Sequence, residues 1–177
     1  MKSLSPAARK FVLHWGEMGT RWGINRTVAQ IHALLYVAAD PMNAEEIAQT
    51  LEIARSNVST SLKELQGWGI IRTVHVLGDR RDYFESMRDV WEMFRIILDQ
   101  RIKREIDPTI LLLRECVDEA SEKRLGDHET HRRLSELLDF FQTMHNWYGQ
   151  IRRLSTQAVM RFVRLGDKVG RWIGAAG

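Results

Sequence analysis

A cluster of small hydrogen-bonding side chains lies in the stretch SNVSTSLKELQGWGII, residues 56–71. Val58, Leu62 and Leu65 follow the spacing i, i+4, i+7, which is that of one helix face. Serine, threonine and asparagine are poor residues for a helix interior, because their side chains compete for backbone hydrogen bonds. The same short groups donate to and accept from base edges and phosphates. The stretch therefore predicts a helix whose outer face serves contact rather than stability.

Projection at about 100° per residue separates the two faces of this helix. The residues expected on or beside the outer face, or at the helix start, are Arg55, Ser56, Asn57, Ser59, Thr60 and Lys63. Ser61 is expected to turn toward the packing side. We expect the outer set to contact DNA. An ordinary solvated helix face is the alternative that this pattern alone leaves open.

A second candidate contact follows at residues 77–81, where Gly78 permits a tight turn between two segments of alternating polarity, residues 70–76 and 81–85. An arginine at the tip of such a hairpin is suited to a minor groove or to phosphates. The hairpin residues expected to contact DNA are Arg72, His75, Arg80 and Arg81. A plain charged turn is the alternative.

The elements that would position these residues are mostly helical. Helices are expected from Pro6 to the Gly19–Gly23 region and over residues 25–39, 44–51 and 54–68, followed by the hairpin. Ser5 and Asn43 are expected N-caps, with Glu46 completing most of a capping box. Glycines at 67 and 69 predict the end of the fourth helix.

The second half of the chain carries helical patterns throughout. We expect helices over residues 88–106, 109–125 and 128–164, with Pro108 breaking or kinking the first boundary and a break near Gly149 in the last. The last pattern is longer than a domain of this size needs for its own core, so we expect it to pack against a second copy.

Together these elements predict a mainly α protein with one small β-hairpin: a winged helix-turn-helix domain plus a long helical dimerisation region. The expected divisions are an N-terminal helix at 1–24, the winged helix-turn-helix at 25–87, and a helical linker and dimerisation region at 88–177. We leave open whether the N-terminal helix packs with the dimerisation region. Two recognition helices set one DNA turn apart would bind a pseudo-palindrome.

The order of these signals resembles the MarR superfamily, and more closely its GbsR-type branch. The resemblance rests on HWGEMGTRWG, ALLYVAADPM, NVSTSLKELQGWGII and GDRRDYF, and it covers residues 14–108. It implies a homodimeric repressor that binds a palindromic operator and is released by an effector. Some relatives control genes for choline, betaine or other compatible solutes.

The aromatic residues of the second half have two interpretations. Packing in the core or dimer interface is the simpler one. The resemblance keeps a second one open, an aromatic cage that holds a quaternary ammonium effector by cation–π contact. The candidate effector residues are Trp91, Phe94, Trp147 and Tyr148.

Charge and composition limit the other function classes. The net charge is only +3, yet residues 1–30 and 148–177 are basic and the remainder is acidic. The basic N-terminal run fits either a DNA-contacting arm or a solvated one. No secretory signal or apolar stretch of membrane length is evident, so we expect a cytoplasmic protein without a membrane partner.

Other chemistry is expected to be absent. His128 and His131 beside Asp127 make a metal site conceivable, but polar residues are common at a helix start, and we expect no metal and no cofactor. Cys116 is the single cysteine, which excludes an intrachain disulfide, and a buried thiol is the usual case. No nucleophile–base pair or phosphate-binding glycine loop suggests an enzyme. A winged helix used only for protein interaction remains the rival hypothesis.

Overall fold

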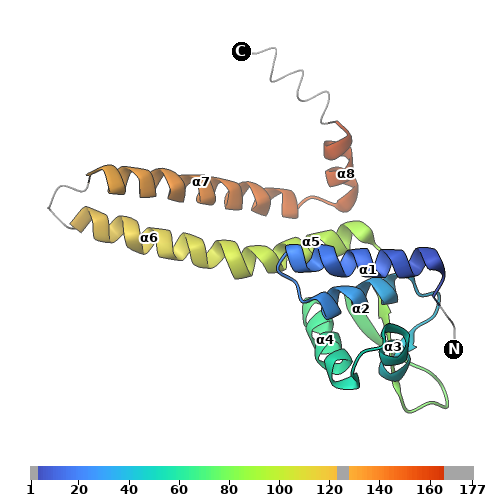
Figure 1. Cartoon of the computed structure of the whole chain (residues 1–177). Coiled ribbons are helices and arrows are strands. Elements are labelled where there is room, and N and C mark those ends of the chain that lie inside the picture. The colour runs from blue at the N-terminus through green and yellow to red at the C-terminus, as the bar shows by residue number, and fades with distance from the viewer. Residues whose placement is uncertain (1–3, 123–127, 166–177) are drawn as a thin grey trace. The chain divides into compact units, whose positions relative to one another are not determined.

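The computed structural model describes residues 4–122 and 128–165 (Figure 1). The chain forms two compact units, Met1–Ile96 and Ile97–Gly177. The elements of the first unit are α1 (Pro6–Arg21), α2 (Arg26–Val37), β1 (Met42–Asn43), α3 (Ala44–Leu51), α4 (Arg55–Trp68), β2 (Ile71–His75) and β3 (Asp82–Ser86). The helix α5 (Val90–Arg101) crosses the boundary between the units.

The first helix packs closely along α2 (Figure 1). Its start is capped as predicted, because the Ser5 hydroxyl accepts a hydrogen bond from the Ala8 amide at 3.2 Å. Glycine permits the close approach farther along: a Cβ atom on Gly19 would lie 2.5 Å from the Cβ of Ala29. The two helices therefore meet at a point where no larger side chain fits.

The helices α2, α3 and α4 enclose the core of the first unit. Ile31, Ile47 and Leu65 are completely buried there. The α3 N-terminus has the full capping box: the Asn43 side chain accepts from the Glu46 amide, and the Glu46 carboxylate accepts from the Asn43 amide. Between α3 and α4 the chain turns at Glu52, whose φ of 57° lies in the left-handed region.

A small antiparallel sheet follows in the order β1-β3-β2. The predicted hairpin is confirmed as β2 and β3, with Thr73 opposite Phe84. The structure adds the two-residue strand β1, in which Asn43 lies opposite Tyr83. The hairpin of β2, β3 and the turn between them, residues 71–86, is called the wing below. It is thus joined to the chain segment that leads into α3.

The second unit continues with a π-helical stretch (Ile102–Ile106), α6 (Asp107–Glu122), α7 (His128–Arg152) and α8 (Thr156–Arg164). Before Pro108 the helix widens: the Asp107 amide donates to the Ile102 carbonyl, five residues back. A proline lacks an amide hydrogen and clashes with the carbonyl four residues earlier, and the wider turn coincides with this position. The expected disturbance at Pro108 is therefore a local widening of the helix.

The last helical pattern is broken near Gly149, as predicted, although not at the glycine itself. Gly149 lies inside α7, and the chain leaves the helix only after Arg152. The new helix α8 starts after Ser155, whose hydroxyl accepts from the Ala158 amide at 3.2 Å. A cap residue, and not glycine, marks this boundary. The predicted end of the preceding helix near residue 125 lies outside the described residues.

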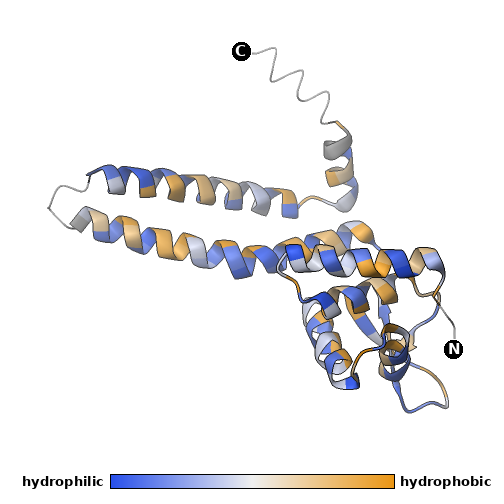
Figure 2. Ribbon diagram, in the orientation of Figure 1, coloured by the Kyte–Doolittle hydropathy of each residue, from blue (hydrophilic) through white to orange (hydrophobic). Residues whose placement is uncertain are grey.

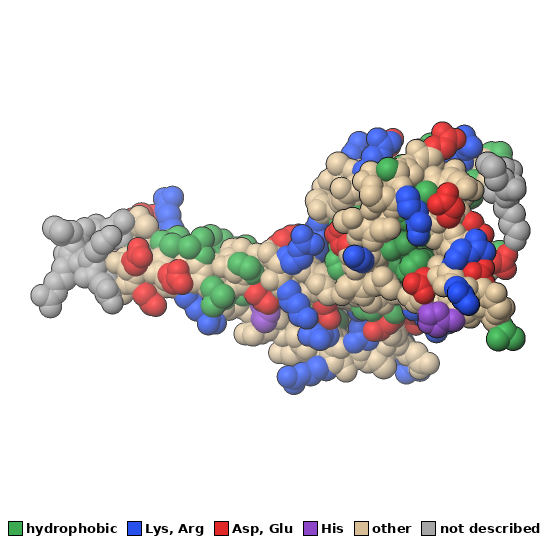
Figure 3. Space-filling model, turned by 90° about the horizontal axis from the view of Figure 1, so that it is seen from below, with side chains coloured by type: hydrophobic (Ala, Val, Ile, Leu, Met, Phe, Trp, Pro, Cys, Tyr) green, Lys and Arg blue, Asp and Glu red, His purple; other side chains and the backbone are tan. Residues whose placement is uncertain are grey.

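The helical hairpin of α6 and α7 leaves much of its apolar surface uncovered. Figure 2 shows hydrophobic residues along both helices, and Figure 3 shows hydrophobic side chains at the surface of this unit. Leu111 and Leu112 are each 59% exposed, and Phe140 is 57% exposed. None of the helices in the described residues is long and apolar enough to cross a membrane. The expected limits of the winged helix-turn-helix (25–87) and of the linker and dimerisation region (88–177) stay a prediction, because the division into two compact units does not test them.

Candidate nucleic-acid interface

The fourth helix, α4, is held by the face that the sequence predicts. Val58, Leu62 and Leu65 are at most 2% exposed, and Ser61 is buried beside them, also as predicted. The opposite side is open: Ser56, Asn57, Thr60 and Lys63 are exposed, and Ser59 is half-buried. The small polar residues therefore lie at the surface, where a partner can reach them.

The two ends of α4 differ. Gly69, with a φ of 77°, forms the predicted glycine C-cap. At the start, Ala54 is the N-cap and gives no side-chain hydrogen bond. A helix start without a capping side chain is a natural site for an anionic group, since its first amides point outward. Arg55 lies at this end, exposed, with its Nη1 atom 3.9 Å from a Glu45 carboxylate oxygen.

At the hairpin tip, Arg81 is bound to its neighbours. Its guanidinium donates to the Asp79 carboxylate and, at 2.9 Å, to the Tyr83 hydroxyl, which in turn donates to Asp79. These hydrogen bonds from Arg81 hold the pKa of Asp79 well below its usual range, and Asp79 raises the pKa of Arg81. The cluster fixes the shape of the turn, and the sequence pattern does not predict it.

Arg80 differs from Arg81. It is exposed, and within the part of the chain that the structure describes it has no ion pair. Of the two arginines predicted at the tip, Arg80 is therefore the one whose guanidinium is available to a partner. Gly78, with a φ of 84°, lies in the turn that carries Arg80.

The two lower hairpin residues, both on β2, face carboxylates of β3. Arg72 forms an ion pair with Glu85 at 2.5 Å, and its side chain is still 80% exposed. His75 lies with Nδ1 3.7 Å from Asp82, a distance that forms an ion pair when the imidazole is protonated. Such exposed pairs are weak and open easily to another partner.

Two further contacts hold the wing on the helices, and no pattern in the sequence predicts them. The Gln66 amide of α4 donates to the Thr73 hydroxyl of β2 at 2.9 Å. The Arg88 guanidinium, after β3, donates to the carbonyls of Tyr36 and Ala38 at the end of α2. Cations near helix C-termini are favourable because the last carbonyls lack partners. Both contacts join residues that are distant in sequence or differ in secondary structure.

The candidate effector residues divide between the two units. Trp91 and Phe94 lie on α5 in the first unit, and both are exposed. Trp147 and Tyr148 lie on α7 in the second unit, where the Tyr148 hydroxyl donates to Asp99 at 2.6 Å. The aromatic cage stays a prediction. Cys116 is half-buried on α6, and Asp127 of the predicted His128–His131 group lies outside the described residues.

Comparison with known proteins gives consistent matches. A model of the MarR family matches residues 22–82. The HTH-type transcriptional repressor GbsR of Bacillus subtilis (strain 168) is 21% identical over 154 residues, which cover 83% of this chain and 85% of that protein. The HTH-type transcriptional repressor OpcR of the same organism is 20% identical over 149 residues, 80% of each chain. The crystal structure of a transcriptional regulator has a TM-score of 0.64 at 24% identity, covering 83% of this chain and 96% of that one, and it shares the fold.

Proposed function

We propose that this chain, a member of the MarR superfamily and of its GbsR branch, regulates transcription. It would do so by binding a specific operator with α4 and the wing. The observation that carries this proposal is the division of α4. One face is fully used in docking the helix, and the other presents Ser56, Asn57 and Thr60 to the surface. A helix with short polar side chains can approach base edges closely in a major groove.

The expected roles of the side chains follow from their chemistry. Ser56, Asn57, Ser59 and Thr60 would donate to or accept from base edges and phosphates. Lys63 and Arg55 would contact phosphates, and the start of α4 would add its free backbone amides.

In the wing, Arg80 would enter a minor groove or bind a phosphate, while the pair of Asp79 and Arg81 holds the turn in shape. Arg72 and His75 would contact the backbone of the DNA. In the alternative, a module for protein interaction, the same surface would bind no specific DNA.

We further propose that the protein acts as a cytoplasmic homodimer that reads a pseudo-palindrome and represses transcription. The exposed apolar side chains of α6 and α7, among them Leu112 and Phe140, support a second copy as the covering surface. The relatives named as repressors support the direction of regulation. A compatible solute or quaternary ammonium effector would bind aromatic faces, and the candidates are Trp91 and Phe94 of the first unit and Trp147 and Tyr148 of the second.

The test is a binding titration by fluorescence anisotropy against the DNA upstream of the protein's own gene, at two salt concentrations. We expect specific binding that weakens steeply with salt, since several phosphates are contacted. Replacing Thr60 by Ala and Lys63 by Gln together should lower the affinity at least about tenfold. The matched control is Lys103→Gln, which changes an exposed lysine of the second unit and should leave the affinity within about twofold.

The result that would overturn the proposal is equal affinity of the double variant and the natural chain. Absence of any change in anisotropy on adding the DNA at low salt would also overturn the proposal, and it would favour the protein-interaction module. Both variants change exposed side chains, so circular dichroism should show unchanged folding in each.

A further inference from the structure

Residues 87–89, called the joint below, form the short link between β3 and α5. Each of the three residues is bonded to a different part of the first unit. The Met87 amide donates to the Ile70 carbonyl at 2.9 Å, between α4 and β2. The Arg88 guanidinium donates to carbonyls at the end of α2, and the Asp89 carboxylate accepts from amides at the start of α5. The joint therefore ties the start of α5 to the body of the first unit.

The contact of Arg88 is made with backbone atoms. Its Nη1 atom lies 3.3 Å from the Tyr36 carbonyl and its Nη2 atom 3.1 Å from the Ala38 carbonyl, so one planar group binds both. These carbonyls lie in the last turn and at the C-cap of α2, where helical partners are missing. The helix itself is packed in the core, since Leu34 and Leu35 are each 1% exposed. The two hydrogen bonds thus hold the joint against a firmly placed helix end.

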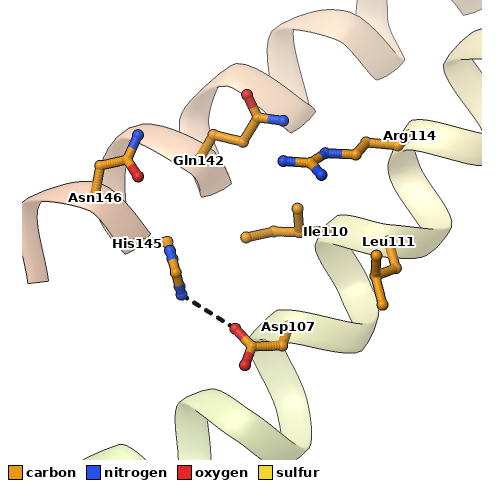
Figure 4. Close-up of a pocket in the computed structure, with 7 residues that line it drawn as sticks. All are labelled: Asp107, Ile110, Leu111, Arg114, Gln142, His145 and Asn146. Atoms are coloured by element: carbon orange, nitrogen blue, oxygen red, sulfur yellow. Dashed lines mark ion pairs between the residues drawn. The ribbon is translucent and has the colours of Figure 1, made fainter. Parts of the chain in front are cut away.

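A polar contact between the helices of the second unit is of another kind. Figure 4 shows His145 of α7 in an ion pair with Asp107 of α6, at 3.1 Å. Both partners are side chains, 42% and 45% exposed, and either can change its rotamer without moving a helix. Such exposed pairs contribute little to stability. Arg88 differs because its acceptors are backbone atoms, which move only when the end of α2 moves.

The joint directly precedes the helix that crosses between the units. This helix, α5, begins at Val90 and continues past Ile96, the last residue of the first unit. The Asp89 carboxylate accepts from the amides of Trp91 at 2.9 Å and Glu92 at 3.1 Å, which stabilises the first turn. A helix of this length bends only gently, so the placement of its first turn determines its direction. The direction in which α5 leaves the first unit is thus determined at the joint.

We propose that Arg88 is a positioning residue for operator binding, because it fixes the direction of α5 and so sets the distance between the two DNA-binding units of a homodimer. The inference rests on the proposed function, in which two copies of α4 bind half-sites about one DNA turn apart. A preorganised dimer matches one spacing of half-sites without an ordering cost, whereas a loose joint adds that cost at every spacing. Loss of the Arg88 contact should therefore weaken binding at the natural spacing and reduce the penalty at a wrong one.

The test uses the full chain and the DNA upstream of its own gene, in which footprinting first locates the two half-sites. Fluorescence anisotropy then gives the dissociation constant for that duplex and for one with two base pairs inserted between the half-sites, which rotates one half-site by about 70°. The spacing ratio is the dissociation constant of the second duplex divided by that of the first. We expect a spacing ratio of at least about 10 for the natural chain and of about 3 or less for Arg88→Met.

The matched control is Arg26→Met, because Arg26 is an exposed arginine at the opposite end of α2. It removes the same charge and should leave the spacing ratio unchanged, whatever it does to the affinity itself. If Arg88 served only stability or a phosphate contact, Arg88→Met would weaken binding to both duplexes by the same factor. Arg88 is exposed, so circular dichroism should show unchanged folding in this variant.

Three results would overturn this proposal and leave the DNA-binding function in place. They are an unchanged spacing ratio in Arg88→Met, an equal fall of the ratio in Arg26→Met, and a natural chain that protects a single half-site or binds both duplexes equally. A natural chain that binds neither duplex would overturn the proposed function, and this proposal with it.

Discussion

The two units of the chain use their apolar side chains in opposite ways. In the first unit Ile31, Ile47 and Leu65 are fully enclosed by helices of the same unit. In the described part of the second unit only Ile110 and Leu113 reach comparable burial, while Leu112 and Phe140 stay more than half exposed. Both units are built from helices with an apolar stripe, so the sequence pattern is similar. The difference lies in whether a covering surface is present within the unit.

This comparison separates two sources of stability. The first unit has the enclosed core that a domain needs to fold through its own contacts. The hairpin of α6 and α7 gains less from the contacts it makes alone, and a second copy would supply the rest. Substitutions in the two regions should therefore differ in size and in their dependence on protein concentration.

The largest effect is expected from Leu65→Ala. Leu65 lies on the inner face of α4 and is completely buried. Its truncation leaves a cavity and should lower the free energy of unfolding by about 2–5 kcal/mol. Leu112→Ala, at a position that is 59% exposed, should change it by less than about 1 kcal/mol in dilute protein. Urea unfolding followed by circular dichroism measures both.

The comparison would fail if Leu112→Ala cost as much as Leu65→Ala in dilute solution. If a second copy covers Leu112, the effect of that variant should grow as the protein concentration rises.

A second large effect concerns His32, which is buried in α2 with its Nε2 atom unpaired among the described residues. Burial lowers the pKa of His32 from 6.5 to about 4. Between these values the unfolded chain binds a proton that the folded chain does not, so stability falls as the pH falls. The full loss, reached below pH 4, is about 3 kcal/mol.

Urea unfolding at pH 7, 5.5 and 4.5 follows this loss. His32→Leu should remove it, because the leucine side chain does not titrate. His14→Gln, at an exposed position of α1, should leave it in place. An identical pH dependence in His32→Leu and the natural chain would show that another group carries it.

The smallest effects have opposite signs in the two units. Gly19→Ala should destabilise by about 1–3 kcal/mol, because its Cβ would lie 2.5 Å from that of Ala29. Gly149→Ala should stabilise by about 0.5–1 kcal/mol, since no atom lies within 4 Å of its added Cβ and alanine favours a helix. Thermal unfolding of both variants gives the two signs. Destabilisation by Gly149→Ala would mean that the surface near this residue is covered.

Local signals made much of the fold predictable. Ser5, Asn43 and Gly69 each act within a few residues of their own position, and all three end helices as expected. The inner face of α4 was predictable for the same reason, since the periodicity of one helix determines it. The break predicted near Gly149 comes a few residues after the glycine, because a glycine without a left-handed φ fits inside a helix, while the cap at Ser155 starts the next one.

Contacts between distant segments were not predictable. A strand of two residues, β1, is too short to produce an alternating pattern. The hydrogen bonds of Arg88 to the end of α2 join residues about 50 positions apart. The pattern predicted both arginines of the wing tip but did not separate Arg80 from Arg81, because the conformation of the turn decides which guanidinium reaches Asp79 and Tyr83.

Asn43 belongs to two elements at once. Its side chain caps α3, and its backbone lies in β1 opposite Tyr83 of the wing. Opening of the wing would therefore withdraw support from the first turn of α3, and fraying of α3 would loosen the wing. We therefore expect hydrogen exchange to show these segments opening as one cooperative unit. We expect β3 of the wing and the first turn of α3 to rearrange together rather than one at a time.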